Sequence, residues 1–245
     1  MDGLLSTLKT QNNDIPDNLS LSISHVKQGG NWDCGIACLH MLLKGSITQD
    51  EINFAIKKHL VDEQVWTVDL AYICSMLGVQ HKLFTVTLGA NDNFSEEPFY
   101  VDRLNEKFST EKERINKLFN EATANKVTIK KKSIKLEEII IHLAVNKRPL
   151  IVLIDDTKMV RIYSNPITSL CNKLKSLDAV DVGDTAVEPR PFWGHYILVT
   201  GYDLTKQTIK FKDPSNDGEK VYCSMQCFEE ARKSFGTDED ILFTY

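Results

Sequence analysis

Several features that would place the chain in a special class of proteins are missing from its sequence. The longest apolar runs, such as Ile139 to Ile141 and Leu150 to Ile154, are far too short to span a bilayer. The N-terminus has no basic segment followed by an apolar one, so it does not resemble a secretory signal. Six cysteines in 245 residues are too sparse for a disulfide scaffold. We therefore expect a soluble protein with reduced thiols, located in the cytoplasm or also in the nucleus.

The sequence also lacks an excess of basic residues. It has 29 lysines and arginines against 34 aspartates and glutamates, a formal net charge of −5. A protein of this charge offers no general positive field to attract nucleic acid or an anionic membrane. We therefore expect neither as a partner, and the composition indicates no oligomeric state.

Internal repeats and low-complexity linkers are absent as well, which favours a single domain. Residues 1–20 are polar and contain Pro16, so they are predicted to be a flexible N-terminal segment. Residues 21–245 form the predicted domain, and the 42% of hydrophobic residues in the chain can supply a substantial core. Within this domain, residues 156–192 have weak periodicity and several prolines, a pattern typical of a long loop or lid.

Hydrophobic periodicity predicts helices in the first half of this domain and more strands in the second half. The predicted helices are one from Cys34 to Leu43 ended by Gly45, one that starts with a capping box of Thr48 and Glu51, and three more at 67–77, 99–124 and 136–145. The predicted strands lie at 21–26, 79–88, 150–154, 195–202, 208–212 and 241–245. The strands at 195–202 and 208–212 are joined by a short polar turn and are expected to form a hairpin.

One short stretch has the features of a nucleophile site: residues 28–43, QGGNWDCGIACLHMLL. A glycine-rich segment turns here into an apolar helix, and Cys34 falls in the first helical turn. A thiol at this position faces the positive end of the helix dipole and unpaired backbone N–H groups, which favour the nucleophilic thiolate. The stretch therefore suits a cysteine nucleophile.

A cysteine nucleophile also needs a base and donors for an oxyanion. His195, at the start of an apolar strand, is the candidate base. Asp213 follows the partner strand of the same hairpin, where it can orient the imidazole. Gln28 is the candidate oxyanion donor, together with the backbone N–H of Cys34.

Four residues that flank the candidate catalytic groups are predicted to bind substrate: Trp32, Gly35, Trp193 and Gly194. The tryptophans can form walls of a cleft, and the glycines let the chain pass close to a substrate. Each residue taken alone is more often structural, and a cysteine at a helix start is usually a small buried side chain. The catalytic hypothesis therefore rests on the combination.

The same residues carry a resemblance to known enzymes. Gln28, Trp32–Gly35, Gly194–Tyr196 and Asp213–Pro214 resemble the motifs of papain-like cysteine peptidases of the bacteriocin-leader-processing type. This resemblance implies an α+β papain-like fold, in which a helical portion that carries the cysteine packs on an antiparallel sheet that carries the histidine and the aspartate. It also implies hydrolysis of a peptide, isopeptide or amide bond through a thioester acyl-enzyme, with a peptide or protein as substrate and no cofactor.

A narrower resemblance implies a different activity. The same motifs, together with Tyr202–Asp203 and the tail Phe228–Phe243, are similar to those of the eukaryotic guanylyl cyclase domain-containing protein family. The family name implies formation of cyclic GMP from GTP as an alternative function. The sequence has no phosphate-cradling loop of the P-loop kind, and the adjacent Asp155 and Asp156 are predicted to point to opposite faces of a strand rather than to one metal. A third alternative is a catalytically inactive papain-like binding module.

The remaining cysteines leave two alternatives to a packing role. The pairs Cys34 with Cys38 and Cys223 with Cys227 offer four thiols for zinc, but three intervening residues on a helix are not the usual zinc spacing. Cys38 also shares a helical face with Cys34, so a regulatory disulfide between them would require both side chains to rotate. We assign no metal site from the sequence.

Overall fold

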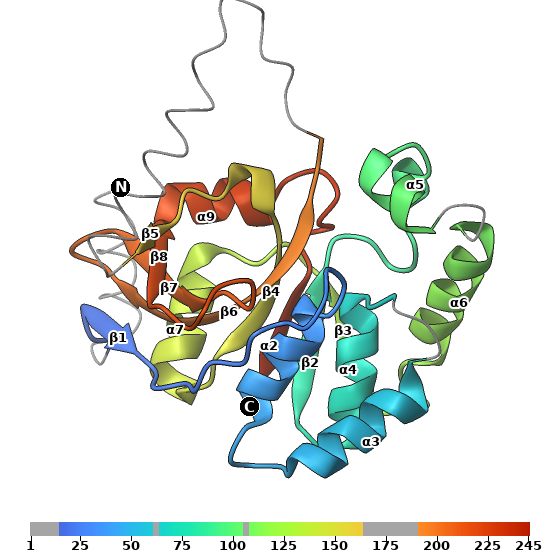
Figure 1. The fold of residues 1–245 in the computed structure, drawn as a ribbon, viewed down its shortest axis with the longest axis horizontal. Coiled ribbons are helices and arrows are strands. Elements are labelled where there is room, and N and C mark those ends of the chain that lie inside the picture. The colour runs from blue at the N-terminus through green and yellow to red at the C-terminus, as the bar shows by residue number, and fades with distance from the viewer. Residues whose placement is uncertain (1–14, 61–63, 105–107, 164–190) are drawn as a thin grey trace, which may run out of the picture.

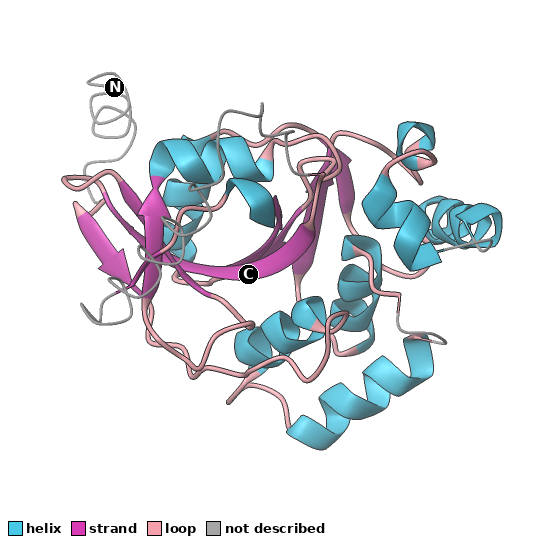
Figure 2. Ribbon diagram, turned by 45° about the horizontal axis from the view of Figure 1, so that its top comes forward, coloured by secondary structure: helices cyan, strands magenta, loops and turns pink. Residues whose placement is uncertain are grey.

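The structure is a computed structural model that describes residues 15–60, 64–104, 108–163 and 191–245 (Figure 1). Its strands form one nine-stranded sheet with helices on both sides (Figure 2). The α+β class predicted from the sequence is therefore confirmed. In the described part of the chain, no helix is both long enough and apolar enough to cross a membrane.

The described elements run along the chain from β1 to β9. In order they are β1 (Asn18–Ser20), α2 (Cys34–Leu43), α3 (Gln49–His59), α4 (Thr67–Met76), β2 (His81–Thr85), η1 (Asp92–Phe94), α5 (Pro98–Leu104), α6 (Phe108–Glu121), β3 (Ile129–Lys131), α7 (Leu136–Asn146), β4 (Leu150–Asp155), η3 (Asp156–Lys158), β5 (Ile162–Tyr163), β6 (Gly194–Asp203), β7 (Thr208–Lys212), β8 (Val221–Ser224), α9 (Met225–Arg232) and β9 (Ile241–Thr244). The strands lie in the order β3-β2-β9-β4-β6-β7-β8-β5, and β1 pairs with the end of β6. The β2–β3 pair is parallel, and the other described pairs are antiparallel.

The sheet separates two hydrophobic clusters, and β4 shows how. Successive side chains of a strand point to opposite faces. Leu150 and Val152 therefore pack into one cluster with residues of α7 and α9. Ile151 and Leu153 pack into the other cluster with residues of α2 and α4. Because Cys34 belongs to this second cluster, the candidate nucleophile is built into the packing of α2 on the sheet.

Capping signals in the sequence account for the first helices. Thr48 and Glu51 form the predicted capping box: the Glu51 N–H donates to Thr48 Oγ1 at 3.3 Å, and the Thr48 N–H donates to the Glu51 carboxylate at 3.0 Å. Gly45 and Gly78 follow α2 and α4 in the left-handed region, with φ of +86° and +69°. The three predicted helices that begin near residues 34, 48 and 67 are confirmed, the first and the third within one residue at their ends.

The predicted hairpin of β6 and β7 is confirmed, with one irregularity. The register of the pair shifts between Val199 and Gly201. At Gly201 a Cβ atom would lie 2.2 Å from the carbonyl oxygen of Leu19, because β1 crosses the end of β6 there. Only glycine allows this close approach of two backbones.

The predicted strand at 21–26 is wrong. The strand β1 ends at Ser20, and it places residues 18–20, part of the expected flexible segment, in the sheet. Leu21 packs against one hydrophobic cluster, whereas Ile23 and Val26 pack against the other. Their alternation therefore comes from a segment that crosses between clusters rather than from a strand. Residues 1–14 lie outside the described residues.

Three other regions differ in detail from the sequence predictions. The expected helix at 99–124 consists of α5 and α6, and residues 105–107 between them lie outside the described residues. In the expected loop at 156–192, the described start forms η3 and β5, and residues 164–190 lie outside the described residues. The short strands β3, β5 and β8 and the helix α9 were not predicted, because segments of two to eight residues carry little periodicity.

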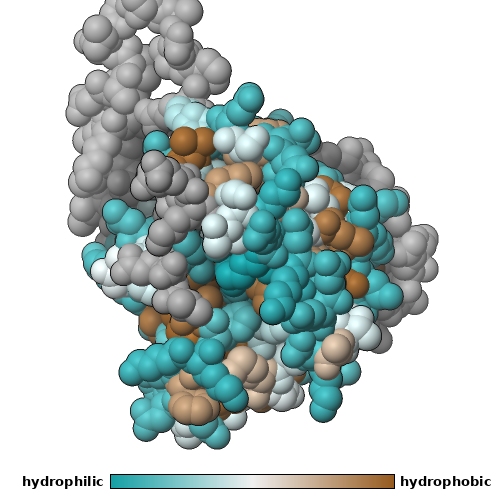
Figure 3. Space-filling view, turned by 90° about the vertical axis from the view of Figure 1, so that its right-hand side faces the viewer, coloured by the Kyte–Doolittle hydropathy of each residue, from teal (hydrophilic) through white to brown (hydrophobic). Residues whose placement is uncertain are grey.

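The helix α6 lies at the periphery of the fold. The face of the molecule on this side is mostly hydrophilic, with small and separate hydrophobic patches (Figure 3). Ile115 is the only residue of α6 that is buried among those described. Arg114 of the same helix contacts Asp69 of α4 at 2.7 Å, so a buried carboxylate helps to hold the helix in place.

Candidate active site

Asp33, which directly precedes Cys34, stabilises the loop before α2. Asp33 is the N-cap of α2, yet its side chain makes no capping bond to the helix. Its carboxylate instead accepts the backbone N–H groups of Gly29 and Gly30 at 2.8 and 2.9 Å. Because no side chain caps the start of α2, the positive end of the helix dipole faces Cys34, the first residue of the helix. Cys34 is 5% exposed.

The candidate base and its orienting residue come from neighbouring strands. His195 is the second residue of β6, and Asp213 directly follows β7, the antiparallel partner of β6. His195 Nε2 and Asp213 Oδ1 are 2.9 Å apart, and both residues are buried. The hairpin therefore brings together two residues that are 18 positions apart in the sequence.

The charges of these residues stabilise one another. Burial alone would lower the pKa of His195, but hydrogen bonds to Asp213 and Cys34 and the attraction of their charges raise it to about 10. Burial would raise the pKa of Asp213, but the His195 hydrogen bond and the nearby Arg161 hold it well below its usual range. At neutral pH this favours an imidazolium between a carboxylate and the Cys34 sulfur. Because Nε2 contacts Asp213, Nδ1 is the ring nitrogen left for the sulfur.

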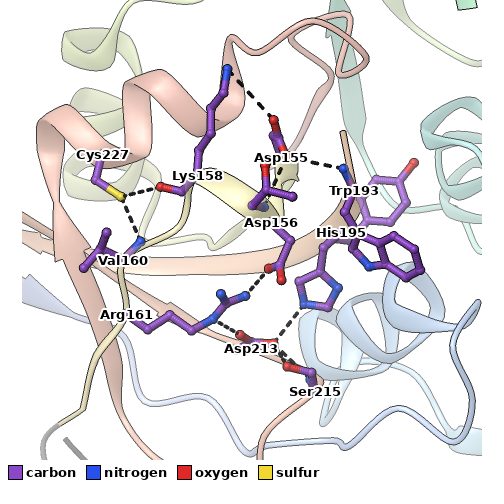
Figure 4. A network of polar contacts seen from close by, with 12 residues as sticks. Asp155, Asp156, Lys158, Val160, Arg161, Trp193, His195, Asp213, Ser215 and Cys227 are labelled. Atoms are coloured by element: carbon purple, nitrogen blue, oxygen red, sulfur yellow. Dashed lines mark hydrogen bonds and ion pairs between the residues drawn. The ribbon is translucent and has the colours of Figure 1, made fainter. Parts of the chain in front are cut away.

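Two residues that the sequence analysis missed also bind Asp213. Arg161 Nε donates to Asp213 Oδ2 at 2.6 Å, and the other end of its guanidinium pairs with Asp156 (Figure 4). The backbone N–H and the hydroxyl of Ser215 donate to Asp213 Oδ1 at 3.0 and 2.7 Å. Both carboxylate oxygens are therefore fixed, which fixes the imidazole in turn. The Asp-Pro-Ser sequence is a turn signal that could have indicated Ser215, whereas nothing in the weakly periodic segment around Arg161 marks that arginine.

The adjacent aspartates at the end of β4 support the site from the side. Asp155 accepts the Thr157 hydroxyl at 2.7 Å and the Ser234 hydroxyl at 2.8 Å. Asp156 pairs with Arg161, and its backbone N–H donates to the carbonyl of Trp193, two residues before the candidate base. The two carboxylates point to different partners (Figure 4). Asp155 ends β4 whereas Asp156 begins η3, so the predicted alternation along one strand does not extend to Asp156.

Gln28 joins the two halves of the site through its backbone. Its N–H donates to the carbonyl of Pro214 at 2.9 Å, so the loop before α2 lies against the turn that follows Asp213. Its side-chain Nε2 donates to the carbonyl of Gly30 at 2.7 Å. One of the two amide hydrogens is thus engaged within the loop.

A small pocket of about 50 Å³ lies next to Cys34. Two of the four predicted substrate-binding residues, Trp32 and Gly194, line it, and much of the remaining wall is aromatic: Trp66, Phe99, Tyr100 and Tyr196. No acidic or basic side chain contributes to the described wall. The pocket therefore suits an uncharged group of a substrate.

The other two predicted substrate-binding residues lie outside this pocket. Trp193 is 52% exposed, and its ring meets Phe99 edge to face at 5.5 Å between ring centres. A Cβ atom on Gly35 would lie 3.0 Å from the ring of Tyr196. Gly35 therefore lets α2 pack closely on β6, which positions the neighbouring Cys34.

The two cysteine pairs are far from forming one metal site. Cys34 and Cys38 belong to the cluster on one face of the sheet, and Cys223 and Cys227 belong to the cluster on the other. All four are free thiols. Burial, followed by the charge of Cys34, raises the pKa of the Cys38 thiol well above its usual value, so Cys38 is a neutral core residue.

The fold and the site together define a mixed α+β protein in which a helix N-terminal cysteine, a histidine and an aspartate form one buried group. Residues 23–244 match the model of a family described as guanylylate cyclase. The chain is also similar to Guanylyl cyclase 1 of Arabidopsis thaliana, with 31% identity over 241 residues, 98% of this chain and 82% of the plant protein. The chain therefore belongs to the guanylylate cyclase family, in agreement with the narrower resemblance of its sequence.

Proposed function

We propose that the protein is a papain-like cysteine hydrolase that cleaves a peptide, isopeptide or amide bond. The observation that carries the proposal is the buried contact of His195 Nε2 with Asp213 Oδ1 at 2.9 Å, next to the Cys34 sulfur, whose interaction with His195 helps to raise the pKa of the imidazole. Thiol, imidazole and carboxylate in this order are the nucleophile, the base and the orienting group of thiol hydrolases. The position of Cys34 in the first turn of α2 supports the same roles.

In the first half of the proposed reaction, the Cys34 thiolate attacks the carbonyl carbon of the scissile bond. The Cys34 backbone N–H and the second amide hydrogen of Gln28 donate to the oxyanion that forms. The His195 imidazolium then donates a proton to the leaving amine, the carbon–nitrogen bond breaks, and the acyl group remains on Cys34 as a thioester.

In the second half, neutral His195 takes a proton from a water molecule. The resulting hydroxide attacks the thioester carbonyl, the carbon–sulfur bond breaks, and a carboxylic acid leaves. The thiolate and the imidazolium are restored, so the net reaction is amide plus water to acid plus amine. The uncharged aromatic pocket beside Cys34 favours substrates with an apolar or aromatic group next to the scissile bond.

A guanylyl cyclase is the second candidate function, and the comparisons favour it. Both the family description and the name of the plant relative refer to this activity. Such a reaction would convert GTP to cyclic GMP, and cyclases of nucleotides normally use divalent metals held by carboxylates.

The described residues do not fit a carboxylate metal centre. In this part of the chain no three histidine, cysteine, aspartate or glutamate side chains gather as metal ligands. Asp155 and Asp156, the candidates from the sequence, are occupied by hydroxyl groups and by Arg161. We therefore derive no cyclisation step from these residues.

The two candidates are separated by two assays on the same set of variants. The first assay measures labelling by a peptidyl acyloxymethyl ketone, which reacts with the nucleophile of a thiol hydrolase without requiring its natural substrate. The second measures cyclic GMP formed from GTP with added Mg²⁺ or Mn²⁺. The variants are Cys34→Ala, His195→Ala and, as a matched control, His59→Ala, which removes a partly buried imidazole that contacts Asp69 instead.

The hydrolase proposal predicts labelling of Cys34 in the wild type and in His59→Ala, and none in Cys34→Ala or His195→Ala. Cyclic GMP formation that persists in Cys34→Ala, with no labelling of the wild type, would overturn the proposal in favour of the cyclase. Absence of both activities would overturn it in favour of a binding module.

A further inference from the structure

A second pair of cysteines lies at the junction of β8 and α9, on the other face of the sheet from Cys34. Cys223 is the third residue of β8, and Cys227 is the third residue of α9. Both are free thiols, and they are hydrogen-bonded to each other. Neither residue takes part in the proposed hydrolysis, yet the fold holds two oxidisable side chains together.

The sulfur of Cys227 has hydrogen-bond partners in both of its protonation states. The backbone N–H of Val160 donates to Sγ at 3.2 Å, and the thiol of Cys223 is a second donor. The carbonyl oxygen of Lys158, also at 3.2 Å, accepts from the protonated thiol. Figure 4 shows Sγ with its two backbone partners. Two donors against one acceptor favour the thiolate.

The start of α9 adds to this preference for the thiolate. Ser224 is the N-cap of the helix, and its hydroxyl accepts the backbone N–H of Cys227 at 3.1 Å. Cys227 therefore lies in the first turn, near the positive end of the helix dipole. The hydrogen bond from Cys223 lowers the pKa of the Cys227 thiol to about 6, and the charge of Arg161 contributes to the same shift.

The two cysteines of the pair differ in reactivity. The hydrogen bond to Cys227, together with burial, raises the pKa of the Cys223 thiol above its usual value. Cys223 is 0% exposed, whereas Cys227 is 9% exposed. Cys227 is thus the thiolate that a small reagent reaches first, and Cys223 is a protonated thiol next to it. This is the arrangement of an attacking and a resolving cysteine.

We propose that Cys223 and Cys227 are a redox-active pair that a hydroperoxide converts to an intramolecular disulfide. The Cys227 thiolate attacks one oxygen of the O–O bond, which breaks. Cys227 becomes a sulfenic acid, and the leaving alkoxide or hydroxide takes a proton from water. The sulfur of Cys223 then attacks the sulfenic sulfur, its proton goes to the departing hydroxide, and water leaves as the S–S bond forms. The net reaction is two thiols plus hydroperoxide to one disulfide, one alcohol and one water, or two waters where the oxidant is hydrogen peroxide.

The disulfide would change how residues 158–161 are held. A disulfide sulfur has neither the negative charge that attracts the Val160 N–H and Arg161 nor the proton that binds the Lys158 carbonyl. Arg161 also binds Asp213 (Figure 4). Oxidation is therefore expected to loosen a segment that supports the candidate active site. Formation of the disulfide itself does not depend on the proposed hydrolase.

The test treats the full chain with hydrogen peroxide near pH 7, then denatures it, blocks the remaining thiols with N-ethylmaleimide and digests it with trypsin. Both cysteines fall in the tryptic peptide 221–232. Their disulfide therefore appears in mass spectrometry as a peptide that has lost two hydrogens and carries no maleimide. The experiment is done on the wild type and on Cys34→Ala, which removes the candidate nucleophile as a source of oxidised sulfur.

Three further variants assign the roles of the two cysteines. Cys223→Ser keeps a hydroxyl that can donate to Cys227, so Cys227 should stop at the sulfenic acid and be labelled by dimedone. Cys227→Ser should leave Cys223 reduced. The matched control is Cys74→Ala, because Cys74 is also a buried thiol but burial raises its pKa to about 12. This control should leave formation of the disulfide unchanged.

We expect the disulfide to form in the wild type and in Cys34→Ala at least about tenfold faster than any oxidation of Cys74, and dithiothreitol to reverse it. Backbone amides of residues 158–161 should exchange hydrogen for deuterium faster in the oxidised protein than in the reduced one.

Three results would overturn the proposal. One is a peptide 221–232 that stays reduced while the same peroxide oxidises added glutathione. A second is a disulfide that joins Cys227 to another cysteine, such as Cys171, instead of Cys223. The third is equal amide exchange of residues 158–161 in both redox states, which would overturn the link between the pair and the segment that contains Arg161.

Discussion

Among the described residues, two clusters are built from the same three residue types, and they differ in what the histidine contacts besides the aspartate. In each, a buried aspartate binds a histidine and an arginine: Asp213 with His195 and Arg161, and Asp69 with His59 and Arg114. The histidine contacts are nearly equal, 2.9 Å in the first cluster and 2.8 Å in the second. The two aspartates are equally hidden, at 1% and 0% exposure.

The difference lies on the other side of each imidazole. The ring of His195 interacts with the Cys34 sulfur at the start of α2. The ring of His59 stacks on Tyr72 at 5.3 Å between ring centres, and Asp69 binds the backbone N–H of Trp66 at the start of α4. The second cluster thus joins helices, whereas the first holds an imidazole between a carboxylate and a thiol. A histidine bound to aspartate and arginine is therefore no sign of catalysis until a reactive partner is found.

Replacing each aspartate by asparagine is expected to have the largest effect and tests whether Cys34 reactivity depends on Asp213 but not on Asp69. Asp213→Asn and Asp69→Asn each remove the charge that a histidine and an arginine share, while Asp156 and Glu111 still pair with the two arginines. Both should lower the free energy of unfolding by about 1–3 kcal/mol, measured by urea denaturation, because each weakens charge-assisted hydrogen bonds of a buried carboxylate. Only Asp213→Asn should also slow alkylation of Cys34. Equal slowing by Asp69→Asn would mean that reactivity follows stability and would remove the distinction between the clusters.

The pH dependence of stability sharpens the account of His195. Its pKa is raised to about 10 in the folded protein, against about 6.5 for an ordinary histidine. The folded state therefore holds this proton more tightly than the unfolded state does. The stabilising contribution of His195 is complete below about pH 6.5 and is lost as the pH rises through about 10.

This contribution can be measured by chemical denaturation of the wild type and His195→Gln. The difference in unfolding free energy between them should narrow as the pH is raised from about 6.5 to about 10. A difference that stays constant, or that widens, would show that His195 is not charged in the folded protein.

The smallest expected effect on the rate of Cys34 alkylation comes from replacing the arginine of each cluster, Arg161 or Arg114. Arg161→Gln removes one donor from Asp213, but the His195 contact and both donors of Ser215 remain. The imidazole should therefore keep most of its orientation, and Cys34 alkylation should slow by about tenfold or less, equivalent to at most about 1.4 kcal/mol. Arg114→Gln in the other cluster should leave the rate unchanged. A loss as large as that of His195→Ala would identify Arg161 as more than a positioning residue.

The sequence predicted those parts of the structure that depend on local signals. These signals affect the structure only within a few residues along the chain. Examples are the capping box at Thr48, the glycine that ends α2 and the alternating residues of the hairpin. The pairing of the candidate residues Cys34, His195 and Asp213 could be proposed because each stands at the end of such a predictable element.

The remaining parts depend on contacts that local patterns do not record. Arg161 and Asp213 are 52 positions apart, and a lone arginine in a polar segment gives no signal. The misplaced strand at 21–26 has the same cause, since its apolar residues pack against clusters formed by distant elements.

The central claim is that His195 activates Cys34 and His59 does not. The most direct test is the rate of Cys34 alkylation by iodoacetamide between about pH 5 and pH 10, followed by mass spectrometry, in the wild type, His195→Ala and His59→Ala. The account predicts that Cys34 of the wild type and of His59→Ala reacts readily near pH 6, and that His195→Ala slows this reaction by about a hundredfold. A wild-type rate that rises only as an ordinary thiol ionises, near pH 8.5, and that is the same in all three proteins, would contradict it.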